Sequence, residues 1–102
     1  MKLITPEFEK RFAEVGEQDI PDPLIIAKFF LPVSAATWWA IAYYPEDNTC
    51  FGYVTGLFVD ELGYFSIDEL EALRITPLQF RIERDLHFEE CRLSDVKSGK
   101  VR

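Results

Sequence analysis

The sequence predicts one α+β domain, with a mostly antiparallel sheet of about four strands and two short helices packed on it, in the order α-β-β-β-α-β. Three observations lead to this fold class. The chain has 102 residues, which is close to the commonest domain size. Its apolar share of 48% is sufficient for a core without metals. Apolar runs of strand length alternate with two segments that begin like helices. We place the domain at residues 1–96 and expect residues 97–102 to form a frayed basic tail.

Two segments carry the start signals of helices. Thr5 is a favoured N-cap residue, Pro6 follows at the first helical position, and Gly16 is expected to end the first helix. Ser66 is the second N-cap, and Glu69 three residues later can complete a capping box. The apolar residues that share one helix face, and that we expect to pack on the sheet, are Phe8, Phe12 and Val15, then Ile67, Leu70 and Leu73.

Four apolar runs predict the strands. The run over residues 24–31 is almost continuously apolar, which predicts a strand that is covered on both faces. Residues 37–44 and residues 50 to about 58 flank a PEDNT turn and predict an antiparallel hairpin. The chain is expected to break at residues 60–63, and a fourth strand is expected within residues 78–90.

The charge is negative and unevenly distributed. The net charge is −7, and because residues 91–102 carry a net +3, the first 90 residues carry −10. Proteins gain affinity for nucleic acid by neutralising phosphates with Lys and Arg, so direct binding to DNA or RNA is disfavoured. The acidity either keeps the protein soluble or forms a face that docks on a basic protein.

The two cysteines and the hydropathy pattern suggest a compartment. Cys50 and Cys91 have no CxxC spacing, so we interpret them as reduced thiols, with a single disulfide as the alternative. The N-terminal MKLITPEFEKRF lacks the apolar core of a signal peptide, and no run approaches the length of a membrane span. We therefore expect a cytoplasmic protein that makes no use of a membrane.

Aromatic residues exceed what an ordinary core requires, with nine Phe, four Tyr and two Trp. Aromatics are enriched at the centres of protein interfaces, although filling the core is the alternative. Alternation along residues 37–44 predicts that Trp38 and Tyr44 share one strand face. The residues that we expect to bind a protein partner are Trp38, Tyr44, Glu46, Asp47, Asp60 and Glu61.

One group of residues has the chemistry for a metal or for acid–base catalysis. Asp85, His87 and Glu89 alternate with the apolar Leu86 and Phe88, which predicts that the three polar side chains share one face of the fourth strand. A single His without a second His or Cys gives a metal little to hold, and a polar solvent face is the alternative. No nucleophile motif or phosphate-binding glycine loop is present, so we expect no cofactor.

The order of six short motifs resembles a known family. The motifs are MKLITPEF, KFF, TWW, FGYVTGL, ELGYFSIDEL and ERDLHF. Over residues 1–96 the chain is similar to the small bacterial domain-of-unknown-function family 2958. The resemblance implies a setting in plasmids, phages and other mobile elements. It implies no catalytic residue, cofactor or substrate.

We therefore predict a small, acidic, non-enzymatic accessory protein of a bacterial mobile element that binds a larger protein. A sharper version is an inhibitor of host defence that presents carboxylates where a nuclease expects phosphates. One alternative is a small metal-dependent or acid–base enzyme that uses Asp85, His87 and Glu89. The other is a homodimer joined through the aromatic sheet face.

Overall fold

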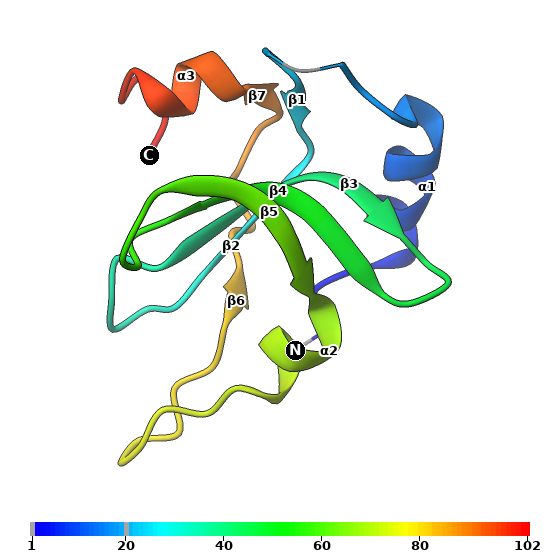
Figure 1. Ribbon diagram of the computed structural model, residues 1–102. Coiled ribbons are helices and arrows are strands. Elements are labelled where there is room, and N and C mark those ends of the chain that lie inside the picture. Colours follow the sequence, from blue (N-terminus) through cyan, green and yellow to red (C-terminus); the bar gives the residue numbers. More distant parts are fainter. Residues whose placement is uncertain (1, 20) are drawn as a thin grey trace.

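The computed structural model describes residues 2–19 and 21–102. Its main feature is a five-stranded antiparallel sheet with the strand order β5-β4-β3-β2-β6 (Figure 1). The strands of this sheet are β2 (Ala27–Phe30), β3 (Thr37–Tyr44), β4 (Thr49–Thr55), β5 (Glu61–Ser66) and β6 (Glu83–Arg84). A second sheet pairs β1 (Leu24–Ile25) with β7 (Cys91–Arg92), and the helices are α1 (Pro6–Val15), α2 (Ile67–Ala72) and α3 (Leu93–Lys97). The α+β class and the mainly antiparallel sheet are confirmed, whereas the number and order of strands differ from the prediction.

The helix starts follow the sequence closely. The Thr5 hydroxyl accepts a hydrogen bond from the Phe8 N–H at 3.2 Å, and Gly16 ends α1 with a φ of +67°. At α2 the Ser66 hydroxyl accepts from the Glu69 N–H, also at 3.2 Å. Each cap satisfies a backbone donor that would otherwise have no partner at the helix end.

The five-stranded sheet is covered on both faces. One apolar cluster lies between the sheet and α1 and α2, and the other lies between the sheet and the β1–β7 pair with α3 (Figure 1). Trp38 and Trp39 are neighbours in the sequence and belong to opposite clusters, with exposed fractions of 8% and 4%. Both tryptophans are therefore core residues.

A β-bulge in β3 reverses the faces of its last residues. The register between β3 and β4 shifts around Ile41, which is the extra residue. Beyond it, Tyr43 packs with the cluster that contains Trp38, and Tyr44 lines a hollow with Ile41 and Phe51 on the opposite side. The prediction that Trp38 and Tyr44 share a face is wrong, because one inserted residue inverts a period of two.

The predicted break at residues 60–63 is also wrong. Residues 61–66 form β5, which pairs antiparallel with β4 as a hairpin. Gly63 and Asp60 are typical of turns, but Gly63 lies directly opposite Gly52 within the ladder. Because β5 is an edge strand and is mostly half-buried, it lacks the apolar alternation of an internal strand.

The apolar run over residues 24–31 divides between two sheets. Ile25 pairs with Cys91 in the small sheet, whereas Ile26 donates its N–H to the Ala40 carbonyl oxygen at 2.9 Å and leads into β2. Because both segments are buried, the sequence is apolar throughout this run, although its residues belong to different sheets.

The C-terminal segment contains structure that the sequence did not indicate. Leu93 opens α3 and is almost fully buried in the second cluster. Val96 and Val101 pack against the same cluster, and the Val101 N–H donates to the Asp95 carbonyl oxygen at 3.1 Å. Apolar residues are sparse here, so their periodicity is too short to predict a helix.

Candidate functional site

The six residues predicted to bind a partner fall into two groups at opposite ends of β4. Trp38, Asp60 and Glu61 lie near the loop that joins β4 to β5, and Tyr44, Glu46 and Asp47 lie near the turn that joins β3 to β4. Since a strand rises about 3.3 Å per residue, the two groups are roughly 20 Å apart. They form two surfaces.

The loop between β4 and β5 exposes three consecutive apolar side chains, which we call the apolar tip. Leu57, Phe58 and Val59 have exposed fractions of 57%, 106% and 62%. Single exposed apolar residues are ordinary on protein surfaces, but contiguous ones usually mark an interaction site. The loop lies at the same end of the sheet as the loop that joins β2 to β3 (Figure 1).

The apolar tip is held in place by its flanking residues. The Gly56 N–H donates a hydrogen bond to Asp60 Oδ1 at 3.1 Å, which closes the base of the loop. Gly56 has a φ of +80°, and a Cβ at this position would collide with the backbone of Ala35 and Ala36. The loop backbone therefore rests on the β2–β3 loop, while its apolar side chains project outwards.

A groove of about 350 Å³ lies behind the apolar tip. Its lining includes the apolar Trp38, Val54 and Phe65, together with Glu61. The groove runs beside β5, which forms one edge of the five-stranded sheet. An edge strand has backbone donors and acceptors directed away from its sheet, and these can pair with another chain.

Around the β3–β4 turn, the aromatic residue is engaged within the molecule. The Tyr44 hydroxyl donates to Glu17 Oε2 at 3.5 Å, and burial, with the Glu17 contact, raises the pKa of Tyr44. Glu46 and Asp47 are exposed in the turn itself. This end of the sheet presents these charges beside the exposed Tyr64 ring, whose centroid lies 6.1 Å from that of Tyr44.

Asp85, His87 and Glu89 do not share a strand face. Residues 86–87 form a turn, in which Asp85 Oδ1 accepts from the His87 N–H at 2.9 Å. Asp85 Oδ2 lies 3.3 Å from Lys28 Nζ. Burial raises the pKa of Asp85, but the bonds from His87 and Lys28 outweigh it and hold that pKa below its ordinary value. Across residues 2–19 and 21–102, no three His, Cys, Asp or Glu side chains are grouped to hold a metal.

The two cysteines lie in different clusters. Cys50 is fully buried in the first cluster and Cys91 packs against the second, and both thiols are free. Burial raises the pKa of the Cys50 thiol to about 12, so its thiolate is scarce at neutral pH.

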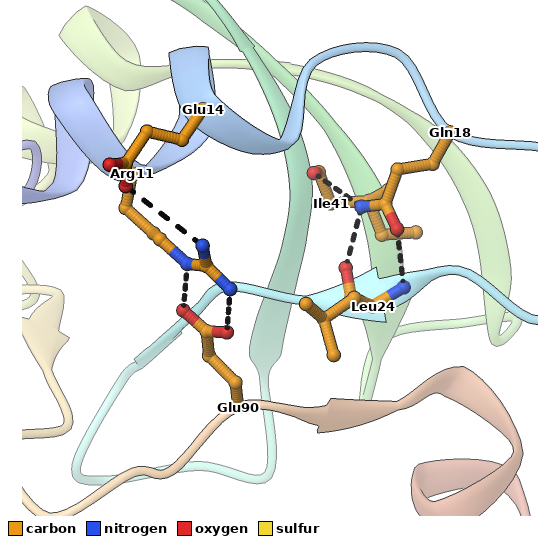
Figure 2. Close-up of polar contacts among 6 residues, drawn as sticks. All are labelled: Arg11, Glu14, Gln18, Leu24, Ile41 and Glu90. Carbon is orange, nitrogen blue, oxygen red and sulfur yellow. Dashed lines mark hydrogen bonds and ion pairs between the residues drawn. The ribbon is translucent and has the colours of Figure 1, made fainter.

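Polar contacts that the sequence did not indicate join the N-terminal segment to the small sheet (Figure 2). The Arg11 guanidinium donates to both carboxylate oxygens of Glu90, at 2.7 and 2.8 Å, and this contact lowers the pKa of Glu90. The Gln18 amide accepts from the Leu24 N–H and donates to the carbonyl oxygens of Leu24 and Ile41. Long side chains that bridge distant segments leave no pattern in a sequence.

Comparison with known proteins identifies a family. A family model described as "Protein of unknown function (DUF2958)" matches residues 3–97, nearly the whole chain. No curated protein and no solved structure shows significant similarity to the chain. Among the described residues, no helix combines the length and apolar character needed to cross a bilayer.

Proposed function

The chain belongs to the DUF2958 family, and we propose that it is a non-enzymatic accessory protein that acts by binding a larger protein through the apolar tip. The observation that carries this proposal is the exposure of Leu57, Phe58 and Val59 on a loop that is fixed at both ends. The mobile-element setting implied by the resemblance fits such a role, since accessory factors commonly act on proteins of the host or of the element.

The energetics favour Phe58 as the anchor. Fully burying a Val, Leu or Phe side chain is worth about 1.5–3 kcal/mol relative to leaving it in water. Interface energy concentrates on a few central, usually aromatic, residues. Because the loop backbone already rests against Ala35 and Ala36, little ordering entropy is lost when a partner binds.

The charge near the apolar tip suggests the character of the partner surface. Asp60 and Glu61 directly follow the tip, and the chain as a whole has a net charge of −7. A partner pocket with an apolar floor and basic residues on its rim complements this arrangement. A nucleic-acid-binding protein has such a rim, which accords with the expected role as an inhibitor of host defence.

Affinity capture with matched variants tests the proposal. Phe58→Asp places a charge at the centre of the apolar tip, and Leu78→Asp makes the same change at another exposed apolar residue, in the loop between α2 and β6. We expect a partner to be retained by the intact chain and by Leu78→Asp, and to be lost by Phe58→Asp. If both variants retain the same partners as the intact chain, the apolar tip is not the binding surface.

A second copy of the chain is the alternative occupant of the apolar tip. Two such chains repel each other because each carries a net charge of −7. We therefore expect light scattering to give the monomer mass at moderate salt. A dimer that is disrupted by Phe58→Asp would show instead that this surface is a homodimer interface.

A further inference from the structure

A second hollow, on the other face of the sheet, collects positive charge in this acidic molecule. It has a volume of about 320 Å³ and lies between the five-stranded sheet and the residues of and after α3. Its lining contains three cations, Lys28, Lys97 and Arg102, and one carboxylate, Asp60. The local charge of the lining is therefore opposite in sign to the net charge of −7.

Lys28 is held in position at the inner wall of this hollow. Its side chain is only 13% exposed, and its ammonium lies 5.0 Å from the centroid of the Trp39 ring. Asp85 contacts the same ammonium, and Asp85 itself lines a different hollow. One of the three ammonium donors is thus directed to Asp85, which leaves others for a ligand.

The other two cations have no carboxylate partner among the described residues. Lys97 lies over the Tyr53 ring, with its Nζ 5.3 Å from the centroid, and Arg102 donates its Nε hydrogen to the Gly99 carbonyl oxygen at 3.4 Å. By contrast, the nearby Lys100 is 4.0 Å from Asp95. Since no described carboxylate pairs with Lys97 or Arg102, both charges remain available to an external anion.

A neutral donor completes the hollow. Thr55 Oγ1 accepts a hydrogen bond from the Trp39 indole N–H at 3.1 Å. The Thr55 hydroxyl hydrogen is consequently free to be donated to a ligand. Donors from Thr55 and from the three cations suit a group whose oxygens are all acceptors, while the single carboxylate of Asp60 limits the negative charge that can be accommodated.

We propose that this hollow binds the dianionic phosphate group of a small molecule. Three cations grouped in one hollow, one of them also paired with Asp85, suit a compact anion better than the extended charge of a nucleic acid, which the acidic surface elsewhere repels. The Trp39 and Tyr53 rings form an apolar part of the lining, which can contact the rest of the small molecule. The site shares Asp60 with the loop of the apolar tip, but the proposal does not rest on the protein-binding function.

The test is a titration followed by NMR of the two indole N–H signals, at about pH 7.5, where a phosphate monoester is mainly dianionic. The probes are inorganic phosphate and phenyl phosphate, with ionic strength held constant by chloride. The Trp39 indole lies at the hollow and the Trp38 indole lies in the opposite cluster, so Trp38 is an internal control. We expect saturable chemical-shift changes of the Trp39 indole N–H signal alone. If phenyl phosphate binds more tightly than inorganic phosphate, the ligand is a phosphate monoester. If the two affinities are equal, the hollow recognises the phosphate group itself.

Variants separate a site from general attraction. Lys97→Gln combined with Arg102→Gln should weaken binding at least about tenfold, since two charge-assisted hydrogen bonds are lost. Lys100→Gln removes one charge, against two in the double variant, from the same segment but outside the hollow, and should leave the affinity unchanged. All three residues are exposed, so folding is preserved and is checked in the same spectra. Absence of a saturable Trp39 shift, equal shifts at Trp38, or equal weakening by Lys100→Gln would overturn the proposal.

Discussion

Asp60 Oδ1 accepts a hydrogen bond from the Gly56 N–H at 3.1 Å, and this contact spans the loop that exposes Phe58. The loop would otherwise be a flexible hairpin end, whose ordering on binding costs free energy. With its base closed and its backbone resting on Ala35, the loop presents its apolar side chains in one arrangement. The protein-binding proposal depends on this fixed presentation.

The first prediction concerns the glycine at the base of the loop. Gly56→Ala should lower the free energy of unfolding by about 1–3 kcal/mol, because φ is positive and the new Cβ meets the Ala35 carbonyl. Gly63→Ala is the matched control, since no atom lies within 4 Å of the place that its new Cβ would occupy. Chemical denaturation of both variants measures the difference. Equal stabilities would mean that the β2–β3 loop does not support the apolar tip.

The second prediction is that the apolar tip makes no contribution to folding. Phe58→Asp should change the free energy of unfolding by no more than about 0.5 kcal/mol, as is usual for exposed positions. Phe29→Ala, at a fully buried position in β2, should cost about 3–5 kcal/mol. Thermal unfolding of the two variants provides the comparison. A large loss in Phe58→Asp would indicate that the side chain packs within its own chain.

The third prediction concerns the ion pair between Lys28 and Asp85. Asp85→Asn can still accept the His87 N–H but loses the charge, and should lower stability by about 0.5–1 kcal/mol at neutral pH. Folding lowers the pKa of Asp85. The contribution of its carboxylate to the free energy of unfolding is therefore complete at pH values above the pKa of the unfolded chain, near 4. It disappears as the pH falls through the pKa of the folded chain. Urea titrations at several pH values should show the two chains converging in acid. A difference that persists in acid would exclude the ion pair as its cause.

The fourth prediction concerns thiol reactivity. Burial raises the pKa of the Cys50 thiol to about 12 and leaves it no exposed surface, so it should resist alkylation by iodoacetamide in the native state. Cys91 is half-buried, and burial followed by the Asp95 charge raises its pKa, so it should react slowly. Mass spectrometry should find both labelled only after denaturation or long exposure. Rapid native labelling of Cys50 would contradict the buried position in the first cluster.

Local signals predicted the parts of this fold that depend on neighbouring residues. The caps at Thr5 and Ser66 lie where the sequence placed them, because a cap is decided within four residues. The strand over residues 37–44 has the predicted bounds, because β-branched and aromatic residues fill it.

Features set by distant contacts could not be predicted. The bulge at Ile41 depends on the pairing of β3 with β4, and it moves Tyr44 to the face opposite Trp38. The division of the apolar run 24–31 between two sheets depends on pairing with β7, which lies far along the chain. For the candidate site, Asp60 and Glu61 are predictions from their charge, whereas the exposure of Phe58 could not be known before the loop was placed outside the core.

Site-specific photo-cross-linking tests the central claim most directly. A photoreactive benzoylphenylalanine in place of Phe58, in cells that express the chain, captures whatever contacts the apolar tip, and the same residue in place of Leu78 is the control. We expect one discrete cross-linked protein partner from position 58, absent from position 78. An identical pattern from both positions, or no cross-link at position 58, would contradict the assignment of the apolar tip as the binding surface.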